Sequence, residues 1–111
     1  MDDALSKRCL PCESGVKPLQ PSEIDRLLKE LPEWKVNAAY AEIYREFHFK
    51  NFSLTMAFVN AVAWIAHQEN HHPDMTVGYN RCIIRYSTHA IQGLSENDFI
   101  CAKKVTKLLT E

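Results

Sequence analysis

The feature that most constrains the fold is a run without a single charged side chain, "SLTMAFVNAVAWIA", at residues 53–66. Apolar side chains recur in it at helical spacing and predict one helical face, formed by Leu54, Phe58, Val62 and Ile65. Three more widen that face beyond the usual amphipathic stripe: Val59, Ala63 and Trp64. The run is shorter than the roughly 20 apolar residues of a membrane span. We therefore expect a helix covered on two sides, by a sheet and by a second subunit.

Alternating polar and apolar residues on either side of this helix predict the sheet. Residues 41–49 alternate as a half-buried strand does, and residues 34–36 are expected to form its short hairpin partner. After the helix, residues 75–80 and 81–88 alternate again, which predicts two more strands.

Two further helices complete the expected order. Ser22 is predicted to cap a short helix that Pro32 stops, and Ser95 is predicted to cap the last helix. The order helix, two strands, helix, two strands, helix indicates an α+β fold. We expect a two-layer sandwich with a four-stranded antiparallel sheet and helices on one face. Residues 1–21 are expected to form an arm and residues 22–111 a single domain.

Composition excludes several classes of function. The net charge is −1, which is unlike a nucleic-acid-binding domain. The first residues lack the apolar core of a secretory signal, and four cysteines are too few for a disulfide scaffold, so we expect a reduced, cytoplasmic protein. Cys9 and Cys12 form a lone C-x2-C in the arm, which supplies two of the four ligands of a structural zinc site.

The stretch "HQENHHPDM" at residues 67–75 holds three of the five histidines. Pro73 disfavours helical geometry at the residue before it, so the helix is expected to end near Asn70 or His71. His67 and His71 are four apart, as in the zinc motif H-E-x-x-H, but Gln68 stands where that motif has its catalytic glutamate. The stretch alone leaves a polar helix end and a functional site equally open.

His89 favours the functional interpretation. It follows the end of a predicted strand, where a side chain projects into a groove. Histidine has an ordinary pKa of about 6.5, so several histidines can donate and accept protons near neutral pH. Without a nucleophile constellation or a complete metal shell, this pattern indicates proton transfer without metal.

The spacing of these residues resembles the motif of the pterin-4a-carbinolamine dehydratases. That motif has an acidic, lysine or histidine residue, three spacers, and H-[H/N]-[P/C/S]; an aromatic residue, a histidine or tryptophan, and an aspartate follow. The matching positions here are His67, His71, His72, Pro73, Tyr79, His89 and Asp98. Glu33 with Trp34, "FHFKNF" at 47–52 and "GLSENDF" at 93–99 extend the likeness over about residues 22–109. Some members have an acid in place of His67, which would favour a protonated neighbouring histidine, whereas His67 does the opposite.

The resemblance implies a hydro-lyase that removes water from 4a-hydroxytetrahydrobiopterin and yields quinonoid dihydropterin. It implies no cofactor and no metal. It also implies recycling of the pterin for an aromatic amino-acid (phenylalanine) hydroxylase, and self-association as a dimer or tetramer, without nucleic acid or membrane. Two alternatives stay open: a metal-binding protein using these histidines or the C-x2-C, and an interaction module.

The resemblance also implies roles for individual residues. His71 and His89 are expected to transfer protons, and His72 to bind and orient the ring, which makes these three the catalytic set. His67 is expected to help bind substrate. For the others, two roles stay open. Trp34 either stacks on the pterin or belongs to the core, and Asp98 either bonds a histidine or caps the last helix with Ser95. Tyr79 is expected to pack near the site with its hydroxyl at the edge.

Overall fold

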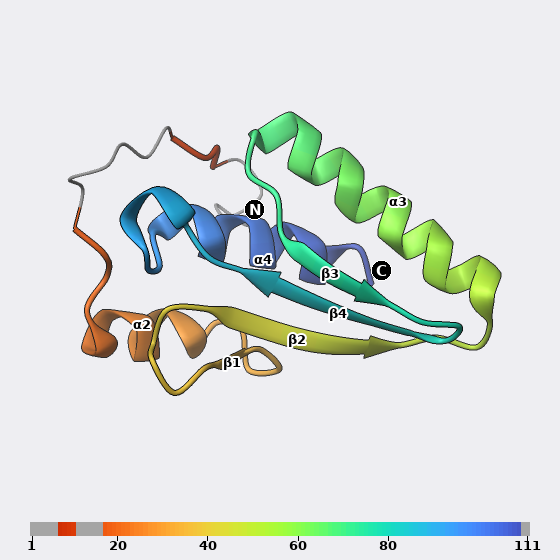
Figure 1. Cartoon of the computed structure of the whole chain (residues 1–111), viewed down its shortest axis with the longest axis horizontal. Coiled ribbons are helices and arrows are strands. Elements are labelled where there is room, and N and C mark those ends of the chain that lie inside the picture. Colours follow the sequence, from red (N-terminus) through yellow and green to blue (C-terminus); the bar gives the residue numbers. More distant parts are fainter. Residues whose placement is uncertain (1–6, 11–16, 110–111) are drawn as a thin grey trace.

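The computed structural model describes residues 7–10 and 17–109. The elements in chain order are α2 (Pro21–Leu28), β1 (Lys35–Val36), β2 (Ile43–His48), α3 (Phe52–Glu69), β3 (Asp74–Val77), β4 (Arg81–Tyr86), the 3-10 turn η1 (His89–Ile91) and α4 (Glu96–Lys107). The strands form one four-stranded antiparallel sheet in the order β1-β2-β4-β3 (Figure 1). The predicted α+β fold is therefore confirmed.

The sheet has one apolar and one polar face because its strands alternate. Cross-strand partners share a face, so Ile43 lies with Tyr86 and Phe47 with Cys82, and all four are buried. The opposite face carries polar pairs such as Tyr44 with Arg85 and His48 with Arg81. In Figure 1, α3 runs along the β3 side of the sheet and α4 lies behind β4. The core therefore lies between the apolar face and the helices.

Helix α3 begins and ends at residues that sequence rules explain. The Asn51 side chain accepts a hydrogen bond from the Leu54 N–H at 2.9 Å, and Asn70 ends the helix in the left-handed region with φ 51°. The predicted end is confirmed. The predicted grouping of Leu54 on one face with Phe58, Val62 and Ile65 does not hold in burial, because Leu54 is 49% exposed and Thr55 is buried with the other three instead. The Thr55 hydroxyl lies 2.9 Å from the carbonyl oxygens of Asn51 and Tyr79, which makes its burial favourable.

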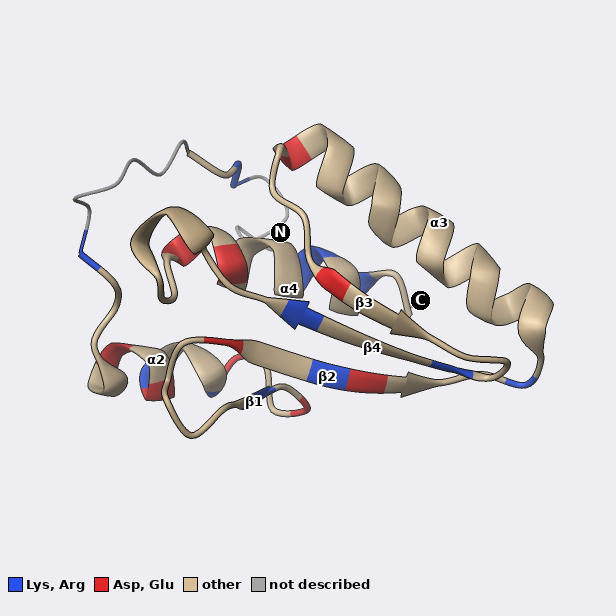
Figure 2. Ribbon diagram, in the orientation of Figure 1, with Lys and Arg blue, Asp and Glu red and all other residues tan. Residues whose placement is uncertain are grey.

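One face of α3 stays exposed in the single chain. Its exposed large apolar side chains are Phe52, Leu54 and Trp64. Figure 2 shows no lysine or arginine on this helix, and its one acidic position lies at the end of the helix. In the part of the chain that the structure describes, no helix has the length and apolar character needed to span a bilayer.

The two outer helices differ in how well their starts were predicted. Helix α4 begins after Ser95 as expected, with Asp98 closing a capping box. Helix α2 begins earlier than predicted, because Gln20 is its cap and Pro21 occupies the first helical position. The Gln20 N–H donates to Glu23 Oε1 at 2.9 Å, so the cap forms two residues before Ser22.

Candidate active site

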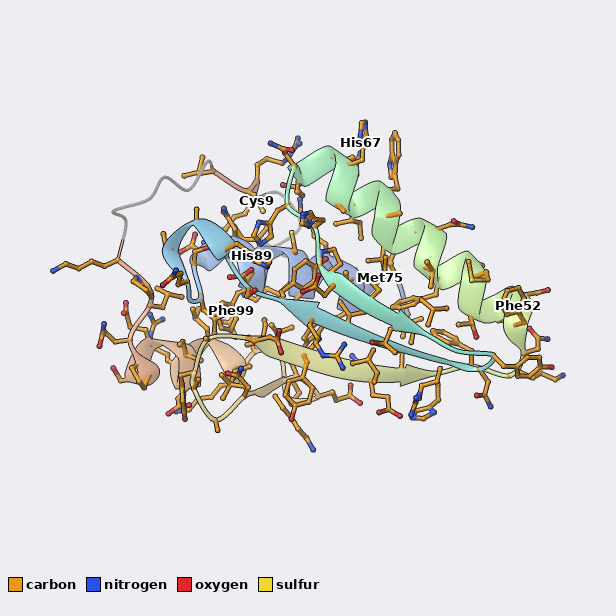
Figure 3. All side chains as sticks on the ribbon, in the orientation of Figure 1. Cys9, Phe52, His67, Met75, His89 and Phe99 are labelled. Atoms are coloured by element: carbon orange, nitrogen blue, oxygen red, sulfur yellow. The ribbon has the colours of Figure 1, made fainter. Side chains whose placement is uncertain are left out.

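A cavity of about 650 Å³ lies where α3 ends and β4 leads into η1. Four of the five histidines line it: His67, His71, His72 and His89. They come from three places along the chain, since His67 is in the last turn of α3, His71 and His72 link α3 to β3, and His89 opens η1. In Figure 3, Cys9 and His89 lie near each other at this end of the molecule, whereas the His67 side chain projects outward from α3.

His71 is the most constrained of these histidines. Its side chain is 13% exposed, and its Nε2 lies 2.7 Å from Oδ1 of Asp98, which is fully buried. The ring stacks on Tyr86 with centroids 5.9 Å apart and planes 8° from parallel. Burial raises the pKa of Tyr86, so this neighbour stays uncharged. The ring of His71 is thus fixed in both position and plane.

Asp98 is held in turn by a network of hydrogen bonds on its other oxygen. Oδ2 accepts the Thr88 hydroxyl at 2.8 Å and the Ser95 backbone N–H at 3.0 Å. Because the Thr88 proton is used there, the Ser95 hydroxyl, 2.7 Å away, donates to Thr88. Since both of these donors lie on Oδ2, Oδ1 is left to accept from the His71 Nε2–H.

The other three histidines are more exposed. His72 and His89 face each other edge to face, with ring centroids 6.5 Å apart. His67 stacks on the exposed Trp64 at 5.3 Å. His89 also borders a second hollow of about 460 Å³ beside Asn37 and Gln92. These rings are accessible to a ligand that enters the cavity.

Two of the residues expected at the site lie elsewhere in this chain. Trp34 is 3% exposed, and its indole N–H donates to the Thr106 hydroxyl at 2.8 Å, so it belongs to the core. Tyr79 is 65% exposed in the turn between β3 and β4 and is not among the residues that line the cavity. Asp98 has both of the contacts considered for it, the cap on Oδ2 and the histidine on Oδ1.

Glu69 was missed by the sequence interpretation, although it is the only charged residue on α3. Its side chain is 2% exposed. Burial raises its pKa, but hydrogen bonds from Lys104 and the Cys9 N–H, with the charge of Lys104 and the Arg8 bond, outweigh this and lower the pKa to about 2. In the sequence, Glu69 could have been noticed as a single acidic residue at the end of a helix that otherwise has no acidic or basic side chain except His67. The Glu69 carboxylate thus connects Arg8 and Cys9 to α3 and, through Lys104, to α4.

The metal-binding alternatives can be compared with the structure only within the described residues. Within residues 7–10 and 17–109, no three His, Cys, Asp or Glu side chains converge as a metal shell requires. Cys12 lies outside the described residues, so the C-x2-C stays a prediction. Cys9 contacts Cys101 instead, with the sulfur atoms 3.6 Å apart.

Comparison with known proteins gives one consistent result. The family model described as pterin 4 alpha carbinolamine dehydratase matches residues 17–108. A relative from Nitrosospira multiformis is 56% identical, covering 97% of this chain and 94% of the relative. One from Nitrosomonas eutropha is 59% identical, covering 96% and 94%. Both are provisionally named pterin-4-alpha-carbinolamine dehydratases.

Solved structures agree on the fold. A structure described as a transcriptional coactivator/pterin dehydratase from Brucella melitensis matches with a TM-score of 0.79 at 32% identity, covering 83% of this chain and 98% of that one. A second is described as a pterin dehydratase-like RuBisCO assembly factor in the alpha-carboxysome. It matches at 20% identity with a TM-score of 0.62, covering 71% and 92%, and shows the fold alone.

Proposed function

This chain belongs to the pterin-4a-carbinolamine dehydratase family of hydro-lyases, and from this premise we propose that it dehydrates 4a-hydroxytetrahydrobiopterin by histidine acid–base catalysis. The observation that supports the mechanism is the 2.7 Å contact between His71 Nε2 and the buried Asp98 at the wall of the cavity. A histidine held by a buried carboxylate keeps its orientation and its tautomer.

The reaction defines what the site has to do. The C4a–O bond breaks, the hydroxyl leaves as water after protonation, and the N5 lone pair forms the C4a–N5 double bond as N5 loses its proton. A general acid must therefore serve the hydroxyl, and a base must take a proton from the ring. Help of this kind contributes roughly 10²- to 10⁴-fold in rate.

His71 and His89 are the residues to which we assign these proton transfers. Asp98 occupies Nε2 of His71, so Nδ1 is the nitrogen that exchanges a proton with the ligand. His89 lies on an adjacent wall of the same cavity and is exposed to it. His72 stands edge-on to His89 and is assigned to bind and orient the ring, with His67 at the rim.

Turnover of a synthetic 4a-hydroxytetrahydropterin by the purified protein, with a chelator present, tests this function. We expect dehydration well above the uncatalysed rate, because proton transfer by histidine needs no metal. Activity that disappears on chelation and returns with zinc would instead assign the cavity to metal-assisted chemistry.

The 4a-hydroxytetrahydropterin substrate links the enzyme to the reaction that supplies it, because aromatic amino-acid hydroxylases leave their pterin with a hydroxyl at C4a. We propose that it recycles the pterin of an aromatic amino-acid hydroxylase in the cytoplasm. The described cysteines, Cys9, Cys82 and Cys101, are free thiols, which suits a reducing compartment. A coupled assay with a phenylalanine hydroxylase, with a reductant present that returns the quinonoid dihydropterin to tetrahydropterin, should show faster, sustained turnover when this protein is added. An unchanged hydroxylase rate would speak against that link.

The exposed apolar face of α3 is the feature that bears on self-association. Leu54 and Trp64, 49% and 60% exposed, lie on the charge-free face of α3. Contiguous exposed apolar surface is unusual on a monomer, so we propose that a second copy covers this face. Sedimentation at micromolar concentration should give at least a dimer, and Trp64→Glu should reduce it to a monomer. A wild-type monomer would contradict the proposal.

A further inference from the structure

We propose that Leu10, in the N-terminal arm, is a substrate-contacting residue that covers one face of the pterin bound beside His71. The inference rests on the proposed function, because it names the ligand as a pterin. Leu10 and Cys9 line the same cavity as the histidines, although between 57 and 80 positions separate them from the histidines in sequence.

The backbone of Leu10 is held in place by Asn97. Its N–H donates to Asn97 Oδ1 at 3.0 Å, and its carbonyl oxygen accepts from Asn97 Nδ2 at 2.6 Å. One side-chain amide thus bonds both polar groups of Leu10. Asn97 is itself buried, 7% exposed, in the first turn of α4, so the clamp is attached to a rigid element.

The residues before Leu10 are held by α3. The Cys9 N–H donates to Glu69 Oε1 at 2.8 Å, and Arg8 Nε lies 2.9 Å from Glu69 Oε2. Lys104 of α4 contacts the same carboxylate at 2.8 Å. Residues 8–10 are therefore held by both helices that border the cavity, and Leu10 has a defined position at its edge.

The Leu10 side chain stays exposed at the edge of the cavity. It is 73% exposed even though the polar groups of its backbone are bonded to Asn97. An exposed leucine is ordinary by itself, but among the described residues that line this cavity Leu10 is the one large aliphatic side chain, since the other aliphatic residues there are Ala66 and Ala90. A pterin has a polar edge and two flat apolar faces. The histidines can form hydrogen bonds with the polar edge and the C4a hydroxyl, and Leu10 provides an apolar contact for one face of the ring.

Two measurements on Leu10→Ala test the inference. The first is the KM and kcat for the 4a-hydroxytetrahydropterin; the second is the Kd for 7,8-dihydrobiopterin, a stable pterin used as the probe. Contact with a ring face is equal in the ground and transition states, so KM and Kd should rise about five- to tenfold while kcat stays within about twofold. Leu10→Met should keep the wild-type KM, kcat and Kd, because methionine supplies a similar apolar contact.

Leu108→Ala is the matched control, because Leu108 is also exposed, at 41%, but lies at the end of α4 outside the cavity lining. Its KM and Kd should equal those of the wild type. If Leu10→Ala also leaves both constants unchanged while the wild type turns over, the inference is wrong and the proposed function stands. If the wild type binds dihydrobiopterin in a Leu10-dependent way but shows no turnover, the proposed function fails and the inference stands. A wild type that binds no pterin would overturn it.

Discussion

Replacing Asp98 with asparagine should slow turnover while leaving the protein folded. In the wild type, Oδ2 accepts from Thr88 and Ser95, and Oδ1 accepts from His71. An asparagine keeps the first two bonds only if its oxygen takes the Oδ2 position. Its NH2 group then faces His71 Nε2, which has to become an acceptor, so the proton moves to Nδ1 and the ring loses its negative partner.

The size of the effect follows from the bond that is lost. A hydrogen bond to a charged group contributes about 1.5–3 kcal/mol, which corresponds to a fall of roughly 10- to 150-fold in kcat/KM. The free energy of unfolding should fall by no more than about 1–3 kcal/mol, since Ser95 and Thr88 keep their acceptor.

The assay combines steady-state turnover with denaturant unfolding of each variant, and nitrogen NMR of the His71 ring reports the tautomer. Asp74→Asn is the control, because Asp74 is exposed on β3 and does not line the cavity. A folded Asp98→Asn protein with at least half the wild-type kcat/KM and an unchanged tautomer would refute the reasoning.

Two further predictions concern the attachment of the arm. The pKa of Glu69 is lowered from 4.5 to about 2, so the ionised carboxylate stabilises the fold fully above about pH 4.5, and this stabilisation is lost as the pH falls towards 2. The variant Glu69→Gln should remove up to about 3 kcal/mol of this pH dependence from the free energy of unfolding. An unchanged pH profile in that variant would contradict the placement of the arm. Because the Cys9 and Cys101 sulfurs are 3.6 Å apart, oxidised glutathione should join them in a disulfide that peptide mass spectrometry detects. The hydrogen bond to Cys9 and burial raise the pKa of Cys101, so disulfide formation should be slow near pH 7 and faster at higher pH. If no disulfide-linked Cys9–Cys101 peptide forms at any pH, the position of Cys9 beside Cys101 is wrong.

The helix and strands around the site could be predicted because each depends on local pattern. The charge-free run predicted α3, and Pro73 predicted where it ends. Leu54 was grouped with Phe58, Val62 and Ile65, but Thr55 is buried with them instead, because its hydroxyl lies beside two carbonyl acceptors that periodicity does not reveal. Local hydrogen bonding likewise placed the start of α2 at Gln20 and not at Ser22.

The site itself was predicted only in part. Motif spacing indicated that His71, His72 and His89 belong together, and the cavity lining agrees. It could not assign Asp98 between capping and histidine bonding, because one carboxylate does both with different oxygens. The contact between Glu69 and the Cys9 backbone leaves no sequence pattern either, since any residue except proline supplies that N–H.

The central claim, that histidines of this cavity perform the dehydration, is tested most directly by the turnover of His71→Ala, His89→Ala and the double variant. His48→Ala is the matched control, because His48 lies outside the cavity with a 69% exposed side chain paired to Glu46. Each single cavity variant should lose about 10- to 1,000-fold in turnover, the double variant should approach the uncatalysed rate, and His48→Ala should match the wild type. Folded His71→Ala and His89→Ala proteins that both turn over at the wild-type rate would contradict the claim.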